Sequence, residues 1–502
     1  MRRWRAGGFR SGTHRAAVVA VLLATACGAS PRVERLVAAR QAEAARASAS
    51  QGVGPADDGY GSGSSASDLQ ALADAAVGTG TRDATPAAGS GRAGGTTATT
   101  IGRTTGTVAG PASGEPGVTA GPADPAAETT AAPVEGNGGA TDTGVTATSI
   151  KIGATFFNGN YLDKYSQVTE QAAAAYFRYV NDQGGIYGRK IEYLTCDTAG
   201  TADGTQGCLR KLANNDKVFA MGPGIDFNLD TVQPFLAEQR LPWIGDPGFY
   251  QGEFDSPWMF PTQIAAFDVG ALIGKFSKQK LGVATVGVSY LNDVAGPPCT
   301  ERVRQIGEQM GYQVVATAEN NQTQGDLTQQ VLTIQAANPD AVLFCNDPIN
   351  TIKFIQAAGR INYRPPKGWV GGFVAADDIP LSAGSAGVGM YGFTSYDFYG
   401  SDLPGVRQFR QITEHYYPSI FHHFYSQAAY VGAMALVEGL RKAGPKLTRS
   451  GLVAAMRSFT DFDTTMGLRI NFADLNSGTA SGIMLQADDK LRWKVVAERF
   501  GL

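Results

Sequence analysis

The stretch AAAAYFRYVNDQGGIYGRKIEYLTCDTAGTADGTQGCLRKLANNDKVFAMGPG (172–224) decides the predicted fold of this chain. Apolar residues recur at helical spacing up to Val180, and Gly184-Gly185 then predict the end of that helix. Strands that alternate with helices of ten to fifteen residues indicate βαβ units and a parallel sheet. The expected elements are helices at 167–181 and about 202–215 and strands at 189–195 and 217–222.

The same alternation extends outward from this stretch and restarts after Pro261. Around the stretch we expect strands at 149–155 and 241–245 and a helix at about 228–239. The second set has expected helices at about 264–278, 300–310, 326–337 and 349–359, and strands at 281–289, 312–317, 340–345, 368–373 and 390–394. Two sets of similar size predict an α/β chain with two Rossmann-like lobes, each built on a parallel sheet.

The C-terminal part breaks this alternation. Two consecutive helices are expected at about 404–416 and 424–443, then a helix near 448–457 and the β-like pieces GLRINF, SGIMLQ and LRWKVVAE. Such a return predicts that the chain crosses between the lobes more than once. The predicted boundaries are 146–265 for lobe 1, with about 397–475 returning to it, and 266–396 for lobe 2, with about 476–502 returning to it.

The N-terminus has the layout of an export signal, with arginines, an apolar run from Ala16 to Ala26, and then Cys27. The run is too short to span a bilayer, which needs roughly 20 residues. The segment Ala24-Thr25-Ala26-Cys27 resembles a bacterial lipobox, although Leu23 lies four residues before the cysteine. We predict a signal peptide at 1–26 and a lipid anchor at Cys27, on the extracellular face of the cytoplasmic membrane. The alternative is an ordinary cleaved signal with an incidental cysteine.

Residues 27–145 are rich in Ala, Gly, Thr, Ser and Pro. Such a segment buries too little apolar surface to offset the entropy of ordering, so we predict a disordered linker. A flexible coil of about 110 residues reaches roughly 55–65 Å. The alternative is low-complexity drift without any length requirement.

Charge and cysteine content narrow the class of protein. The net charge is −3, which gives no electrostatic support to nucleic-acid binding. No segment after the signal has 18 uncharged apolar residues in a row, so no transmembrane helix is expected. The four cysteines after Cys27 are an even number, which in an exported domain indicates two disulfides, with free buried cysteines as the alternative. Three pairings are open; we favour Cys196–Cys208 and Cys299–Cys345 because each lies within one lobe, the second pair at two strand ends.

Ligands of open α/β sheets bind outside the carboxyl ends of the strands. The loops predicted there carry aromatic and fixed polar side chains, which suit recognition of a small polar ligand. For any one of them the alternative is an ordinary turn-forming role. The candidate ligand-binding residues are Asn158, Asn160, Tyr161, Gly224, Asp226, Phe227, Asp246, Tyr290, Asn292, Asp347, Phe373 and Tyr396.

Catalytic and metal-binding patterns are weak. There is no GxSxG elbow, HExxH motif or P-loop. His422 and His423 are adjacent, and a surface or capping role is favoured over metal binding. Asp377-Asp378 is interpreted as a solvated turn and helix cap. We therefore expect no catalytic residue, no metal, no cofactor and no enzyme activity.

Residues 172–224 also closely resemble the extracellular solute-binding proteins of branched-chain amino acid ABC transporters. That family carries an N-x-x-G-G-I-x-G-R-K segment, an aspartate after the next strand and a K-V-x-A-x-x-G strand. The matching residues are Asn181, Gly184, Gly185, Ile186, Gly188, Arg189, Lys190, Asp197, Lys217, Val218, Ala220 and Gly222, and the helix at 426–444 matches the family's late helix. The resemblance covers about 148–502.

The resemblance implies a periplasmic-binding-protein type I fold, with two lobes joined by three hinge strands and the ligand in the cleft between them. It implies capture of a small amino acid, amide or related solute by lobe closure, for delivery to ABC permease subunits, and we expect a monomer. A sensory module of the same fold that reports to a membrane signalling partner is the alternative. An exported α/β enzyme would need a nucleophile or base in the cleft.

The chain departs from the family pattern in two loops. Branched-chain amino acid binders usually place Ser or Thr after the third and fourth strands, where these loops carry Asp226 and Asp246 and no hydroxyl. An acidic residue disfavours a neighbouring carboxylate and favours an amine or a hydroxyl-rich ligand. The ligand class therefore stays open among amides, polyamines, aromatics and other amino-acid-like compounds.

Overall fold

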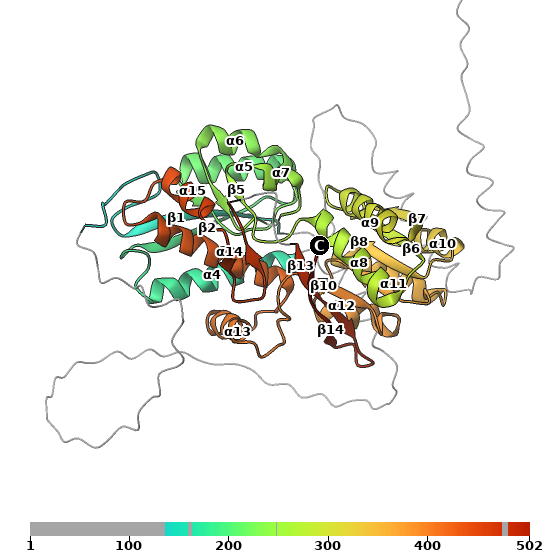
Figure 1. Cartoon of the computed structure of the whole chain (residues 1–502). Coiled ribbons are helices and arrows are strands. Elements are labelled where there is room, and N and C mark those ends of the chain that lie inside the picture. Colours follow the sequence, from blue (N-terminus) through green and yellow to red (C-terminus); the bar gives the residue numbers. More distant parts are fainter. Residues whose placement is uncertain (1–135, 159–162, 247, 474–479) are drawn as a thin grey trace, which may run out of the picture. The chain divides into compact units, whose positions relative to one another are not determined.

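The computed structural model describes residues 136–158, 163–246, 248–473 and 480–502. Its strands form a five-stranded sheet (the first sheet) and a seven-stranded sheet (the second sheet), shown in Figure 1. A two-stranded sheet joins β11 (Phe462–Asp463) and β12 (Arg469–Ile470). The predicted α/β class with mostly parallel strands is confirmed.

The first sheet has the order β2-β1-β3-β4-β5, and all of its neighbouring strands are parallel. Its strands are β1 (Ser149–Phe156), β2 (Lys190–Asp197), β3 (Ala220–Met221), β4 (Trp243–Ile244) and β5 (Met259–Phe260). Three of these strands have only two residues, so β3 and β4 are shorter than predicted and β5 was not predicted. The carboxyl ends of β1, β3 and β4 share one edge of the sheet, where the loops that follow them gather.

The second sheet has the order β14-β13-β10-β9-β8-β6-β7. Its strands are β6 (Thr285–Leu291), β7 (Gln313–Asn320), β8 (Ala341–Cys345), β9 (Trp369–Gly371), β10 (Tyr391–Thr394), β13 (Ser481–Ala487) and β14 (Trp493–Gly501). The pairs among β6 to β10 are parallel, whereas β13 pairs antiparallel with both β10 and β14. The sheet is therefore mostly parallel, as predicted, with an antiparallel edge that the sequence did not indicate. The short connection between β13 and β14 can join only antiparallel strands.

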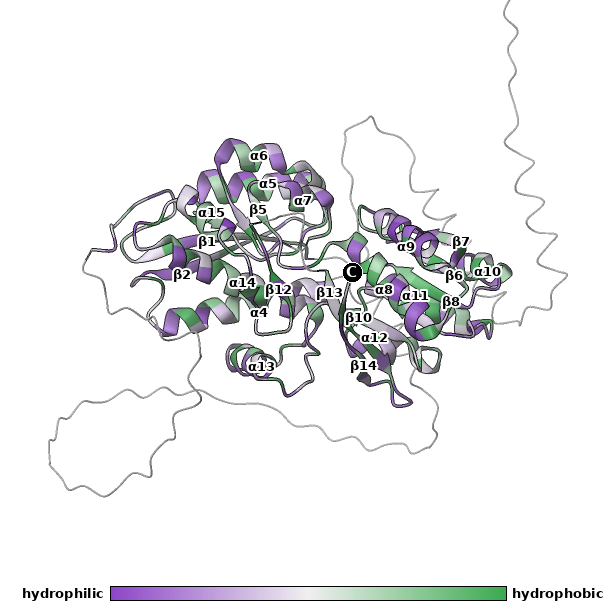
Figure 2. Cartoon of the chain, in the orientation of Figure 1, coloured by the Kyte–Doolittle hydropathy of each residue, from purple (hydrophilic) through white to green (hydrophobic). Residues whose placement is uncertain are grey.

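Helices cover both sheets. Those associated with the first sheet are α4 (Asp163–Asp182), α5 (Ala202–Arg210), α6 (Gln233–Gln239), α7 (Gln251–Asp255), α13 (Pro404–Tyr416), α14 (Phe424–Ala443) and α15 (Arg449–Arg457). Those associated with the second are α8 (Ala266–Leu281), α9 (Gly296–Met310), α10 (Thr328–Ala336), α11 (Pro348–Arg360) and α12 (Asp378–Ala383). In Figure 2, β8 is largely hydrophobic while α6 and α9 carry many hydrophilic residues, as expected for surface helices over a buried sheet.

Helix α14 lies beside α4 and is the most deeply packed helix of this group. It is buried on nearly all sides, which its run of small and apolar residues allows. This helix, which the sequence placed correctly, reaches the edge of the first sheet where the loops gather.

Two predicted helices differ in detail. The helix expected at 202–215 is α5 followed by a π-helical turn at Lys211–Asn215. The helix expected at 228–239 is a 3₁₀ turn at Leu229–Thr231 followed by α6, whose first turn contains Pro234. Proline fits the first turn of a helix, where its missing N–H is not needed, and so it marks a new start.

The turn between α4 and β2 requires glycine. Gly185 has φ +78°, and a Cβ there would lie 2.0 Å from the carbonyl oxygen of Arg189. Only glycine adopts this conformation without strain. The turn sends the chain directly into β2, which explains why Gly184-Gly185 is informative in the sequence.

Both favoured disulfides are present, Cys196–Cys208 with Cα atoms 5.6 Å apart and Cys299–Cys345 with Cα atoms 5.8 Å apart. The first joins β2 to α5, and the second joins α9 to the end of β8. The expectation that Cys299 lies at a strand end is wrong, since it lies in the first turn of α9. Each bridge stays beside one sheet.

The linker predicted at 27–145 ends earlier than expected. Residues 136–145 pack on the folded part, with Val145 buried and the Asn137 side-chain amide donating to the carbonyl oxygens of Ala147 and Tyr187. The signal peptide, Cys27 and the rest of the linker lie outside the described residues. In the described ranges, no helix combines the length and apolar character that a membrane span requires.

Candidate functional site

The loops after β1, β3 and β4 carry three stacked phenylalanines. The ring centroids of Phe157 and Phe227 are 5.0 Å apart, and those of Phe227 and Phe249 are 5.1 Å apart, with nearly parallel planes. The series continues to Phe373, after β9 of the second sheet, at 6.4 Å from Phe249. Phe424, at the start of α14, lies 6.2 Å from Phe373. We call these five rings the aromatic seam; it joins the loops of one sheet to a loop of the other.

Asp226, in the loop after β3, is held by the protein itself. It is fully buried, and its carboxylate accepts hydrogen bonds from the Thr205 hydroxyl (2.8 Å) and the Asn228 backbone N–H (3.1 Å). Burial raises its pKa, and these hydrogen bonds act in the opposite direction. The side chain therefore fastens the loop to α5.

Asp246, after β4, forms a buried acidic pair with Glu253 of α7, and the sequence did not indicate Glu253. The Glu253 carboxyl accepts from the backbone N–H groups of Gly248, Phe249 and Tyr250 at 2.8, 3.1 and 3.0 Å. Burial raises the pKa of Asp246 to about 6. Burial, and then the charge of Asp246, raises the pKa of Glu253 well above its ordinary value. The pair therefore shares one proton near neutral pH.

This acidic pair predicts a pH-dependent stability. The pKa of Asp246 is raised in the folded protein from an unfolded value of about 3.9. Its contribution to the free energy of unfolding is therefore fully present below about pH 4 and is lost as the pH rises through 6. Asp246→Asn keeps the shape but cannot ionise. From pH 4 to pH 7.5, we expect the free energy of unfolding of the variant to rise relative to that of the wild type by on the order of 2–3 kcal/mol. Chemical denaturation at both pH values measures this difference.

The matched control is Asp402→Asn, whose side chain is 91% exposed. Its ion pair with Arg410 at 3.4 Å is of the exposed kind that contributes about 0–1 kcal/mol, so this variant should unfold almost as the wild type does at both pH values. If the stability of Asp246→Asn changes with pH in the same way as that of the wild type, Asp246 does not have the raised pKa described above.

A small cavity of about 10 Å³ lies beside Asp246, which is enough for about one water molecule. Its lining comes from the loops after β3 and β4, from Gln263, and from helices α4 and α14. The lining residues are Thr169, Gly224, Ile225, Gly245, Asp246, Gln263, Tyr425, Ala428 and Ala429. Of these, the sequence had indicated only Gly224 and Asp246.

Tyr425 connects this cavity to the second sheet. It is buried, and its ring lies 4.0 Å from that of Phe424 in the aromatic seam. Burial raises its pKa, and the charges of Asp347 and Asp293 raise it further. Those carboxylates belong to the loops after β8 and β6, so the tyrosine lies where the loops of both sheets meet.

Each sheet with its helices forms one half of the folded part of the chain. A second contact between these two halves joins α4 to α12. Lys164 forms an ion pair with Asp378, and the Tyr165 hydroxyl donates to the same carboxylate at 3.2 Å. The Tyr165 ring also packs against His423 at 4.7 Å. The interpretation of Asp378 as part of a solvated turn is therefore wrong.

The remaining predicted site residues do not line the cavity. Tyr290 and Asn292 both donate to Glu319 of β7, at 3.0 and 2.8 Å. Asp347 caps α11 by accepting from the Asn350 backbone N–H at 2.8 Å. The Tyr396 hydroxyl donates to the Thr262 carbonyl oxygen at 2.8 Å, between two segments that connect the sheets.

In the loop after β1, the backbone N–H of Asn158 donates to the Asp197 carboxylate at 2.9 Å. Asn160 and Tyr161, which belong to the same loop, lie outside the described residues.

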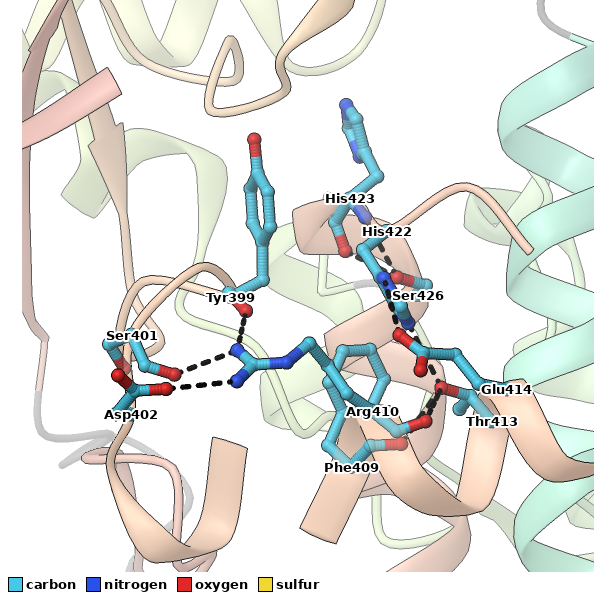
Figure 3. A network of polar contacts seen from close by, with 10 residues as sticks. All are labelled: Tyr399, Ser401, Asp402, Phe409, Arg410, Thr413, Glu414, His422, His423 and Ser426. Carbon is cyan, nitrogen blue, oxygen red and sulfur yellow. Dashed lines mark hydrogen bonds and ion pairs between the residues drawn. The ribbon is translucent and has the colours of Figure 1, made fainter. Parts of the chain in front are cut away.

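His423 has the capping role favoured from the sequence. Its Nδ1 accepts from the Tyr425 backbone N–H at 3.1 Å. The backbone N–H of His423 donates to the Ser426 hydroxyl at 2.9 Å (Figure 3). The two histidines precede α14 rather than lying within it. Burial lowers the pKa of His423 well below its usual value, so the ring is neutral. No group of three metal-ligating side chains occurs in the ranges that the structure describes.

A polar network around α13 fixes one connecting segment, as Figure 3 shows. Arg410 donates to the carbonyl oxygens of Tyr399 (2.5 Å) and Ser401 (2.7 Å), and the Tyr399 hydroxyl donates to Asp377 at 2.8 Å. On the next turn, Thr413 contacts His422 at 3.1 Å. The network thus links α13, the segment after β10 and the turn before α12.

Comparison with known proteins gives one family and many similar folds. The family model described as "Periplasmic binding protein" matches residues 149–490. No curated protein sequence matches the chain.

Three solved structures illustrate the shared fold. A fatty acid ABC transporter substrate-binding protein from Thermomonospora curvata is 22% identical, with a TM-score of 0.66 over 72% of this chain and 95% of that one. A leucine-binding protein from Thermotoga maritima is 14% identical, with a TM-score of 0.60 over 69% and 98% of the two chains. A branched-chain amino acid transporter substrate-binding protein from Streptococcus pneumoniae, in complex with isoleucine, is 17% identical, with a TM-score of 0.60 over 71% and 100%.

Proposed function

Because this chain belongs to the periplasmic binding protein family and has its type I fold, we propose that it is the extracytoplasmic solute receptor of an ABC importer. It captures a small amino-acid-like solute between its two α/β halves. The observation that carries the proposal is the meeting of loops from the carboxyl ends of both sheets, through Phe249 against Phe373 and through Tyr165 on Asp378. Ligands of such sheets bind at this edge.

The receptor works by closure. The solute must bind the closed arrangement better than the open one, since equal affinity for both would shift nothing. Tyr396 and Thr262 lie on two connecting segments and share a hydrogen bond, which suits residues that bend as a unit when the halves move. No covalent bond of the solute is made or broken. A permease reads the closed form.

The location follows the same proposal. A lipid on Cys27 would hold the receptor, as a monomer, on the outer face of the cytoplasmic membrane, and residues 27–135 would connect it to that anchor. Labelled fatty-acid incorporation in the producing cell, with Cys27→Ser as the control, tests the anchor separately from the binding activity.

A thermal-shift panel on the full chain tests the receptor function. The solutes are amino acids, amides, polyamines, small aromatics and fatty acids, the last because one similar structure is a fatty acid receptor. A solute at 100 times its dissociation constant adds about 2.7 kcal/mol of stability, which raises the melting temperature by several degrees. Mass spectrometry of the recovered solute should show it unchanged. No response from any class, or conversion of the solute to a product, would contradict the proposal.

A further inference from the structure

The aromatic seam gives the proposed cleft an apolar wall. Phe157, Phe249 and Phe424 are buried, whereas Phe227 and Phe373 keep partial exposure. Flat rings prefer offset-stacked or edge-on neighbours, and Phe249 already has one of each, in Phe227 and Phe373. A solute that enters between the halves therefore meets the faces and edges of aromatic rings. These rings offer few hydrogen-bonding groups to a small polar solute.

The acidic group of the site comes from the same loop. Asp246 is three residues before Phe249 and lines the cavity, with only 1% of its surface exposed. Its Oδ1 accepts from the Gly248 N–H at 3.3 Å, and its buried Oδ2 accepts no hydrogen bond from the described residues. A residue that lines the cavity therefore carries a buried carboxyl oxygen that no described donor satisfies.

The surroundings favour a positive partner for that site. No lysine, arginine or histidine is among the described residues that line the cavity. Lys164, in the first turn of α4, is already paired with Asp378. The charges of Asp347 and Asp293, in loops of the second sheet, also act on Tyr425, a lining residue of the cavity. A carboxylate solute would meet like charge here. An ammonium would find an acceptor with the aromatic ring of Tyr425 in the same cavity wall, which is itself favourable.

We propose that the cleft takes an aromatic primary amine without a carboxylate, its ammonium on Asp246 and its ring against Phe249 and Phe373. This inference rests on the proposed receptor function and narrows its ligand class. It excludes ordinary α-amino acids as the best ligands, since their carboxylate would lie close to the acidic pair.

Titration calorimetry on the full chain tests the inference with matched probes. 2-Phenylethylamine carries both groups, 3-phenylpropanoate exchanges the amine for a carboxylate, and 3-methylbutylamine lacks the ring. We expect 2-phenylethylamine to bind about tenfold or more tightly than either of the other two. Asp246→Asn should weaken its binding about tenfold, and Phe249→Leu about fivefold, while Asp402→Asn leaves it unchanged.

Two results would overturn the inference. One is binding of 3-phenylpropanoate or leucine as tightly as 2-phenylethylamine. The other is an Asp246→Asn variant that melts cooperatively and binds the amine as the wild type does. Both leave the receptor function intact, because a solute is still bound; that function fails only if no class in the thermal-shift panel stabilises the chain.

Discussion

Replacing Arg189 by methionine is expected to lower the free energy of unfolding by about 3–5 kcal/mol, the largest loss predicted for a single side chain of this protein. The guanidinium is fully buried and donates to Thr146 at 2.7 Å and to Pro445 at 2.9 Å. It also donates to the carbonyl oxygens of Asn137 and Gly139. Methionine fills a similar volume but leaves four carbonyl groups without their donor. Denaturant unfolding measures the loss.

Arg304→Met is the matched control. Arg304 lies on α9 with 44% of its side chain exposed, and it forms an ion pair with Glu301 one turn away at 3.1 Å. Such exposed pairs contribute about 0–1 kcal/mol, so the variant should unfold almost as the wild type does. Equal losses for the two variants would mean that Arg189 does not hold the N-terminal segment in place.

Gly432→Val is expected to cost about 3 kcal/mol and to disturb the site at the same time. Helix α14 approaches the loop after β4 so closely that a Cβ at Gly432 would lie 2.9 Å from the Cα atom of Gly245 and 3.0 Å from Pro223. Gly245 directly precedes Asp246, so the added side chain pushes on the loop that carries the acidic pair. The variant should have a lower melting temperature and a weaker affinity for 2-phenylethylamine than the wild type.

Gly207→Val is the control that distinguishes the steric clash at Gly432 from the effect of valine on helix propensity. Gly207 is an exposed residue of α5, and a Cβ there meets nothing within 4 Å. Both substitutions place a β-branched residue in a helix, where valine is slightly better than glycine. Gly207→Val should therefore be neutral or slightly stabilising. A cost at Gly207 as large as that at Gly432 would contradict the close approach of α14 to the first sheet.

The sequence predicted the long elements well and the short ones poorly. β1 and α4 have eight and twenty residues, so their periodicity is visible over several repeats. β3, β4 and β5 have two residues each, which is too short for any pattern. The antiparallel edge at β13 and β14 depends on which strand the returning chain joins, and nothing local in SGIMLQ encodes that choice.

The site was predicted by position more than by chemistry. Asp226 and Asp246 follow neighbouring strands and look equivalent in sequence, yet one is held by Thr205 and the other shares a proton with Glu253. Contacts between distant segments could not be predicted from the sequence. An example is the hydrogen bond between Tyr165 and Asp378, which are 213 residues apart. A fully buried glutamate five residues after a glycine-containing loop gave no signal of its own.

Hydrogen–deuterium exchange of the full chain, with and without the solute that gives the largest thermal shift, tests the central claim most directly. We expect the solute to slow exchange in loops of both sheets, because one solute draws the two halves together around it. The first-sheet loops are 222–228 and 248–250, and the second-sheet loops are 346–350 and 373–378. Protection confined to the loops of one sheet, or found elsewhere while all four loops stay unchanged, would contradict it.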